Sequence, residues 1–224
     1  MSPRSRRLLP LLCLAGGPAL LSCADIATPS RTIAYEWRRI VATATGPDTL
    51  SFHWPQSRLP VRVWAEDTLN LPAHVQHGLG RWEAAFLYGE FRSVVVSDSS
   101  VADVIVTSGI APKGGFSVTR LESFMAPECQ GATDIELDAS GHQILPPIRV
   151  YVDPRFEPSS PGVDACMALT TTHELGHSLG IFNHSPNSDD LMFADPTVTD
   201  LSPRDRATAE LDYHTEPTLT IAPR

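Results

Sequence analysis

The hydrophobic and polar positions change period several times along this chain, and each change predicts an element. Residues 59–66 alternate apolar and polar side chains, which is the period of a half-buried strand. Residues 71–88 place apolar side chains three or four positions apart, with a proline in the first turn, so an amphipathic helix is expected. Short β-branched runs at 91–97 and 102–107 predict two more strands.

The second half of the chain adds two strands and two helices. Residues 134–138 and 148–153 have strand composition on either side of a Ser-Gly turn. Ser160 followed by proline has the composition of a helix start, and Gly180 fits the end of that helix. Ser202 is the expected N-cap of a last helix that reaches residue 214.

The stretch HELGHSLGIFNHSPNSDDLM, residues 173–192, carries the candidate chemistry. His173 and His177 are four residues apart, so a helix projects both imidazoles from one face. A turn after the helix is expected to bring His184 toward the same point. Three neutral imidazoles bind zinc and leave a fourth position for water, and Glu174 beside them is suited to accept a proton from that water.

These residues resemble the metzincin zinc-peptidase signature H-E-x-x-H-x-x-G-x-x-H followed by a Met-turn, and they are most similar to the matrixin branch. A serine follows the third histidine, and Leu191-Met192 lies beyond it. The resemblance covers about residues 59–214 and implies an α+β domain with a twisted mixed sheet of about five strands. It further implies a long helix on the N-terminal side, the zinc-bearing helix, a Met-turn with Met192 beneath the imidazoles, and a C-terminal helix.

One position departs from the family pattern. The pattern places the third histidine at position 183, which is Asn183 here, so His184 implies one extra residue in the loop. An amide oxygen is a poor substitute for an imidazole on zinc, and His184 is therefore expected to be the ligand. Asp189 and Asp190 are the next candidates. An insertion in a loop leaves the first two ligands where they are.

The resemblance also implies that an edge strand along the cleft pairs with an extended substrate through backbone hydrogen bonds. Residues 116–120, with Phe116, Val118 and Arg120, are the candidate strand, and an ordinary edge strand or surface loop is the alternative. Structural calcium is not indicated, because the acidic residues at 134–138 fit a solvated strand face and no loop has a recognisable calcium spacing.

Residues 1–22 have the features of an export signal. Three arginines precede an apolar stretch that is too short, and too interrupted by glycine and proline, to span a bilayer. The following Cys23 completes a sequence that resembles a bacterial lipobox, so a lipidated N-terminus is expected, with ordinary signal-peptidase cleavage as the alternative. Residues 23–58 have no strong period and are expected to be a tether or a short propeptide; residues 215–224 are expected to be a tail.

The chain is thus expected in the cell envelope as a membrane-anchored lipoprotein facing the periplasm or the surface, or secreted if Cys23 is not lipidated. Cysteine usage agrees with export, because Cys129 and Cys166 remain as a pair that most simply forms one disulfide in an oxidising compartment. Thiolate ligation of the metal is the alternative. Cys166 stands about two helical turns, roughly 10 Å, before His173, which is too far for a shared ion.

Charge and composition limit the partners. The 224 residues, 42% of them hydrophobic, suit one domain with a real core. The net charge of −9 becomes −12 when residues 1–22, with three arginines and no acidic residue, are removed. Such a negative net charge does not favour binding to nucleic acid or to anionic lipid. The expected partner is a protein or peptide substrate, membrane contact is expected through the lipid alone, and the chain is expected to be a monomer.

The function predicted from the sequence is a zinc-dependent endopeptidase with one Zn²⁺ held by His173, His177 and His184 and with Glu174 as general base. Two other classes stay open. One is an inactive binding module on the same scaffold, favoured by the extra residue before His184. The other is a lipoprotein that needs zinc only to fold. Glu174 beside the metal has no purpose in either.

Overall fold

The computed structural model describes residues 32–43, 46–112, 118–120, 124–125 and 128–223. They belong to one compact unit, Thr32–Arg224. The predicted signal segment, Cys23 and Phe116 lie outside the described residues. In the described part of the chain, no helix combines the length and the apolar character needed to cross a membrane.

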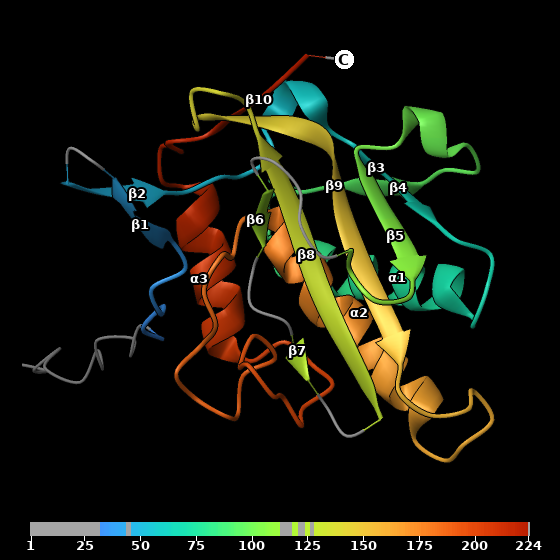
Figure 1. Cartoon of the computed structure of the whole chain (residues 1–224). Helices are drawn as coiled ribbons and strands as arrows, with labels where there is room; N and C mark the ends of the chain where they lie inside the picture. Colours follow the sequence, from blue (N-terminus) through green and yellow to red (C-terminus); the bar gives the residue numbers. More distant parts are fainter. Residues whose placement is uncertain (1–31, 44–45, 113–117, 121–123, 126–127, 224) are drawn as a thin grey trace, which may run out of the picture. The chain divides into compact units, whose positions relative to one another are not determined.

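A mixed sheet is the framework of this unit (Figure 1). Its continuous order is β4 (Ser93–Val95), β3 (Val61–Ala65), β5 (Val104–Ser108), β9 (Gln143–Pro154), β8 (Cys129–Leu137) and β6 (Val118–Arg120). The first four run parallel, whereas β8 is antiparallel to β9 and β6 is antiparallel to β8. The predicted α+β class is confirmed.

The sheet has more strands than the five that the sequence predicts. The additional ones are short: β6 and β7 (Phe124–Met125) pair with β8, and β10 (Thr220–Ile221) pairs with β9. Burial along β3 alternates as predicted, with Val61, Val63 and Ala65 in the core. The central strand β9 buries β-branched side chains at Ile148, Val150 and Val152.

Two helices, α1 (Leu71–Glu83) and α2 (Val163–Leu179), lie side by side against one face of the sheet, as Figure 1 shows. Trp82 of α1 is fully buried, and its indole N–H donates to the backbone carbonyl of Thr172 in α2 at 2.8 Å. The second half of α2 is buried on all sides, between α1 and the strands β8 and β9. Polar side chains in that half are therefore inside the protein, where they need partners.

The third helix, α3 (Pro203–Tyr213), begins as predicted after Ser202. The Ser202 hydroxyl accepts from the backbone N–H of Asp205 at 3.0 Å, and the Asp205 carboxylate accepts from the N–H of Ser202 at 2.9 Å, which is a capping box. The N-terminal segment packs on this helix: the Tyr35 N–H donates to the Thr208 hydroxyl at 3.1 Å. It continues into a separate hairpin of β1 (Arg39–Thr43) and β2 (Gly46–Leu50).

The folded unit extends beyond both predicted boundaries. Residues 23–58 are predicted above as a tether or propeptide, but within the described part of that range the core contains four aromatic side chains, Tyr35, Trp37, Phe52 and Trp54. The predicted tail also belongs to the fold, because Leu219 is buried and β10 is hydrogen-bonded to β9. Both segments are held by residues far away in the sequence, which the local pattern does not reveal.

Two helix boundaries also differ from the prediction. The helix expected to start at Ser160 begins at Val163, because residues 160–163 form a turn closed by a hydrogen bond from the Val163 N–H to the Ser160 carbonyl, 3.2 Å. The helix α1 ends at Glu83 rather than at residue 88. Beyond it Leu87 and Tyr88 are exposed, so their apolar character does not mark a buried helix face.

Candidate metal centre

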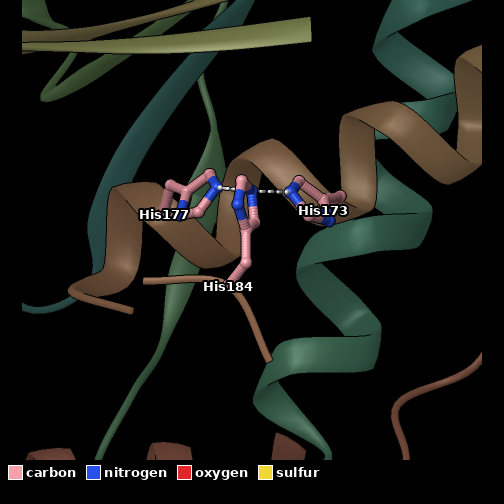
Figure 2. A group of neighbouring side chains, drawn as sticks. All are labelled: His173, His177 and His184. Carbon is pink, nitrogen blue, oxygen red and sulfur yellow. Dashed lines mark hydrogen bonds between the residues drawn. The ribbon is translucent and has the colours of Figure 1, made fainter. Parts of the chain in front are cut away.

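Three imidazoles from α2 and the loop after it converge at one point (Figure 2). His173 and His177 project from the same side of α2, and the helix ends at Gly180, which has φ 128°. A side chain at Gly180 would also collide with the carbonyl oxygen of Phe52, since a Cβ atom would come within 1.8 Å. The turn that only glycine allows here brings His184 back toward the helix, as the sequence predicts.

The ring nitrogens have the spacing of metal ligands. The Nε2 atom of His184 lies 3.2 Å from the Nε2 atoms of both His173 and His177. Nitrogen ligands at about 2.0–2.1 Å from a tetrahedral metal lie about 3.3–3.4 Å from one another. The three side chains can therefore hold one metal ion with little adjustment.

The remaining ring nitrogens of the two helical histidines are fixed by backbone carbonyls. His173 Nδ1 lies 2.8 Å from the carbonyl oxygen of Leu191, and His177 Nδ1 lies 2.5 Å from that of Ile181. Because a carbonyl only accepts hydrogen bonds, Nδ1 carries the hydrogen and Nε2 carries a lone pair. With both Nε2 lone pairs directed at His184, that ring can share a hydrogen with at most one of them, whereas a cation satisfies all three.

Burial keeps these imidazoles neutral. His173 is fully buried, and desolvation, with a smaller effect from His184, lowers its pKa to about 3. Desolvation also lowers the pKa of His177 well below its ordinary value, and electrostatic repulsion with His173, His184 and Arg39, which opposes protonation of the ring, acts in the same direction. Neutral imidazole is the form that binds a metal, so these two side chains are ready for it at neutral pH.

Glu174 is fully buried and is held by strand β8. The Thr133 hydroxyl donates to Glu174 Oε2 at 2.7 Å and also lies 3.1 Å from the backbone carbonyl oxygen of Glu174. Gly131, two residues earlier on β8, leaves room for the carboxylate, because a Cβ atom there would approach Glu174 Oε1 to 2.5 Å. No pattern in the sequence pointed to Thr133 or Gly131, since their role arises from the pairing of β8 with α2.

The loop that carries Met192 is fastened to both histidine segments. Met192 is fully buried, and its Sδ atom packs against Gly176 of α2, where a Cβ atom would come within 2.5 Å. The backbone N–H of Ser185, next to His184, donates to the Met192 carbonyl at 2.8 Å. Asp205 of α3, which belongs to no recognisable motif, accepts from the Leu191 N–H at 2.8 Å and from the Met192 N–H at 3.4 Å. The second N–H belongs to the same peptide unit as the Leu191 carbonyl that orients His173.

The alternative metal ligands that the sequence offers either bind other partners or are exposed to solvent. The Asn183 side-chain amide donates to the backbone carbonyl of Arg38. Asp190 is bonded to the Ser185 hydroxyl and forms an ion pair with Arg204 at 3.0 Å, while Asp189 is exposed. Of the four candidates for the last position, the structure therefore brings His184 to the other two histidines.

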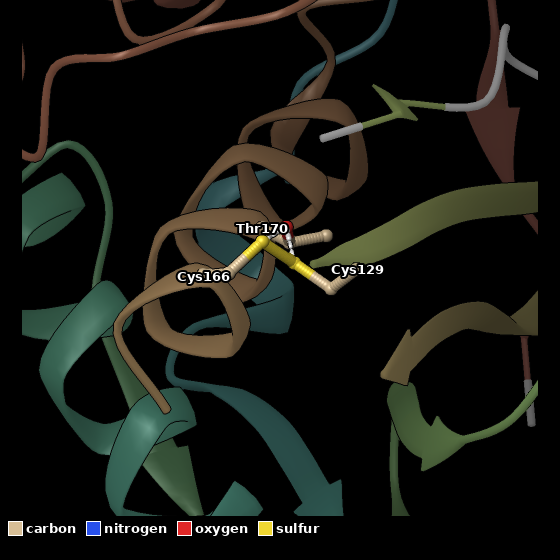
Figure 3. Close-up of a disulfide and its surroundings, with 3 residues drawn as sticks. All are labelled: Cys129, Cys166 and Thr170. Atoms are coloured by element: carbon tan, nitrogen blue, oxygen red, sulfur yellow. Dashed lines mark hydrogen bonds between the residues drawn. A yellow bond between two sulfur atoms is a disulfide. The ribbon is translucent and has the colours of Figure 1, made fainter. Parts of the chain in front are cut away.

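The other predicted residues fall elsewhere in the fold. Cys129 of β8 and Cys166 of α2 are at disulfide distance, with Cα atoms 6.1 Å apart, and the hydroxyl of Thr170 lies 3.0 Å from the Cys129 sulfur (Figure 3). Val118 and Arg120 are in β6, the terminal strand on the β8 side of the sheet. The position of an edge strand is thus as predicted, and its role in substrate binding stays a prediction.

In comparisons with known proteins, no family model matches this sequence and no curated protein matches it significantly. On the geometry of its residues, the site can hold one metal ion on three imidazoles, with a buried carboxylate at the intervening helical position.

Proposed function

We propose that this chain is a zinc-dependent endopeptidase of the metzincin type, most similar to the matrixin branch. The observation that carries the proposal is the group of three converging imidazoles, with Glu174 next to His173 on the helix that carries two of them. Magnesium and calcium prefer oxygen ligands, whereas a site of three histidines with one open position is typical of catalytic zinc. A purely structural zinc site closes its fourth position with another protein ligand.

The roles of the side chains follow from their contacts. Bound zinc would polarise the scissile carbonyl and lower the pKa of a water molecule. Glu174 would accept the proton of that water and deliver it to the leaving amine. Thr133 holds the Glu174 carboxylate in one orientation, and the carbonyls of Leu191 and Ile181 hold the two helical imidazoles. Strand β6 remains the candidate for pairing with an extended peptide, through the backbone of Val118–Arg120.

We propose the cell envelope as the location of this activity. The arginine-rich and apolar residues 1–22, followed by Cys23, support export and lipidation. The cysteine pair 129–166 supports an oxidising compartment, since such pairs are rare in cytosolic proteins. We also propose that the exported chain acts as a monomer on protein or peptide substrates.

The test is cleavage of an unfolded generic protein by residues 24–224, which contain the whole described unit, with zinc supplied. Glu174→Gln should retain zinc and lose nearly all turnover, because the amide cannot accept the proton. His177→Ala should lose both zinc and turnover. Zinc content is measured by elemental analysis beside each rate. A Glu174→Gln protein that cleaves at the wild-type rate refutes the assignment of the base.

The same experiment distinguishes the two other functional classes, the inactive binding module and the lipoprotein that needs zinc only to fold. Zinc retained without cleavage of any unfolded substrate favours the inactive binding module. If chelation instead unfolds the protein, zinc is needed for the fold, whereas in an enzyme chelation mainly removes activity. Circular dichroism of the chelated protein distinguishes these results.

A further inference from the structure

A cavity of about 420 Å³ opens beside the metal centre. Its wall is made by two stretches of chain, one from the N-terminal segment and one from the loop that carries the third histidine. The lining residues are Glu36, Arg39, Phe182, Asn183, His184 and Pro186. We call it the His184 cavity. Because His184 belongs to the metal-binding group, whatever occupies the cavity lies next to the proposed reaction site.

The two walls are fastened together by hydrogen bonds. The Trp37 carbonyl accepts from the backbone N–H groups of Phe182 and Asn183, at 2.8 and 3.0 Å. The Trp37 indole N–H donates to Asp212 at 2.6 Å, and Trp37 is buried. The Asn183 amide closes the contact by donating to the Arg38 carbonyl. The residue before the third histidine thus serves to attach the N-terminal segment to the loop.

One of the charged side chains that line the cavity, Arg39, has no partner of opposite charge among the described residues. The Glu36 carboxylate receives two hydrogen bonds from the Arg38 guanidinium, 2.6 and 2.7 Å, and Arg38 also stacks on the Trp37 ring at 5.1 Å. The side chain of Arg39 has no hydrogen bond or ion pair within the described residues, although it is half-buried. Among the described residues, the cavity therefore presents the Arg39 guanidinium without a carboxylate partner, beside the metal centre and in a chain of net charge −9.

We propose that the His184 cavity is a subsite for the carboxylate of a peptide substrate, with Arg39 as the residue that recognises it; this rests on the proposed peptidase function. A guanidinium presents a planar pair of N–H donors that matches a carboxylate, and the interaction strengthens where water is partly excluded. The apolar walls of Phe182 and Pro186 suit the methylene part of such a side chain. The carboxylate comes either from an acidic side chain or from the C-terminus of the peptide.

The experiment uses matched peptides that differ only in charge. In the first series, the two peptides of each pair have aspartate or asparagine at one position near the cleaved bond, and each position is tested with its own pair. A further pair has no internal acidic residue and ends either in a free carboxylate or in an amide. Cleavage efficiency (kcat/KM) is measured with residues 24–224 and zinc. Dissociation constants for the same peptides are measured with zinc-loaded Glu174→Gln protein, so that binding is observed without turnover. The variants are Arg39→Gln and Arg39→Lys, with Arg155→Gln, an exposed arginine that does not line the cavity, as control.

We expect an aspartate or a free C-terminus at one position to improve binding and kcat/KM by about tenfold or more over its neutral match, as for a charge-assisted hydrogen bond. Arg39→Gln should abolish the preference, Arg39→Lys should keep part of it, and Arg155→Gln should keep all of it. Dependence on Arg39 separates the subsite from direct binding of the carboxylate to zinc. The pair that shows the preference identifies the source of the carboxylate.

The outcomes for the two proposals are distinct. Cleavage of both members of every pair at equal rates, or a preference that survives in Arg39→Gln, overturns the subsite and leaves the peptidase standing. Binding of the acidic peptide that depends on Arg39, without cleavage by the wild type, supports the subsite and counts against the peptidase. Absence of both binding and cleavage overturns the two together.

Discussion

At the residue scale, the carboxylate next to the metal centre depends on a hydroxyl from another element. Glu174 is fully buried, and Thr133, which is 41 positions away in the sequence, donates to its Oε2 atom at 2.7 Å. A buried carboxylate needs such donors, because taking it out of water is costly. The motif around Glu174 could be identified from the sequence, whereas Thr133 could not, since nothing local distinguishes it from other strand threonines.

Replacing Thr133 with valine keeps the side-chain shape and removes this donor. We expect kcat/KM to fall about 10- to 100-fold, as for the loss of a hydrogen bond to a charged group, with zinc affinity unchanged. Thr133→Ser should restore most of the activity because it restores the hydroxyl. Wild-type kcat in Thr133→Val would show that the hydroxyl does not position the base.

A second buried carboxyl makes a prediction about pH. Burial raises the pKa of Asp212 well above its usual value, against the opposing effect of the hydrogen bond from Trp37. The folded chain therefore keeps this proton above about pH 4, where the unfolded chain releases it. Stability is accordingly lost as pH rises from about 4 through the folded-state pKa.

Asp212→Asn cannot ionise and keeps an oxygen that accepts the Trp37 N–H. The variant should therefore resist urea better than the wild type at pH 8 and about equally at pH 4. Unfolding midpoints at several pH values provide the measurement. Parallel pH curves for the two proteins would contradict the role given to this carboxyl.

At the scale of elements, the position of α2 is fixed by contacts with neighbouring elements. The disulfide between Cys129 and Cys166 fixes the first turn of the helix to β8, the strand that also carries Gly131 and Thr133. Helix ends fray easily, so the link holds the start of α2 against β8 and helps to keep the carboxylate close to its donor. The pairing and the position of Cys166 near the start of the zinc-bearing helix were predictable from the sequence, whereas Cys129 lies in strand β8 and not in a loop.

Removal of this disulfide should destabilise the chain without changing its chemistry. A loop closed over a separation of 37 residues is worth about 4 kcal/mol in the chain-entropy model. The Cys129→Ala, Cys166→Ala double variant should show that loss in urea unfolding, and reductant should lower the wild type to the same level. A double variant as stable as the oxidised wild type would refute the estimate.

The hydrophobic periodicity predicted an element correctly where one face of that element is buried. The alternation in β3 and the spacing of Val75, Leu79 and Trp82 in α1 predicted both elements and their buried faces. The prediction for the N-terminal segment was wrong because its buried aromatic residues have no regular spacing in the sequence. Tyr35 and Trp37 among them are held by hydrogen bonds to α3. Contacts across 170 and 175 positions leave no local signature.

At the scale of the whole molecule, metal binding and folding are coupled through the buried histidines. The pKa of His173 is about 3 in the fold and near 6.5 in the unfolded chain, and that of His177 is also lowered. As pH falls below about 6.5, the unfolded chain takes up protons that the folded chain does not, so stability is lost toward pH 3.

Metal-free protein should therefore lose stability on acidification through this window, and zinc should oppose the loss. At a free zinc concentration 100-fold above Kd, the gain is about 2.7 kcal/mol. Thermal melting with zinc or chelator, from pH 7 to pH 4, measures both effects. His184→Ala, which removes a half-exposed ligand, should show no zinc-dependent gain; an equal gain there would place the metal elsewhere.

The contact of the N-terminal segment with α3 has a consequence for the timing of activity. Tyr35 and Trp37 find their partners 170 and 175 positions later, in α3. Asp205 on that helix also accepts from the Met192 N–H, in the peptide whose carbonyl orients His173. A chain that crosses a membrane N-terminus first cannot complete this candidate metal centre until α3 has emerged. On the proposed function, the translocation machinery would handle an inert polypeptide, and hydrolytic capacity would appear only after release.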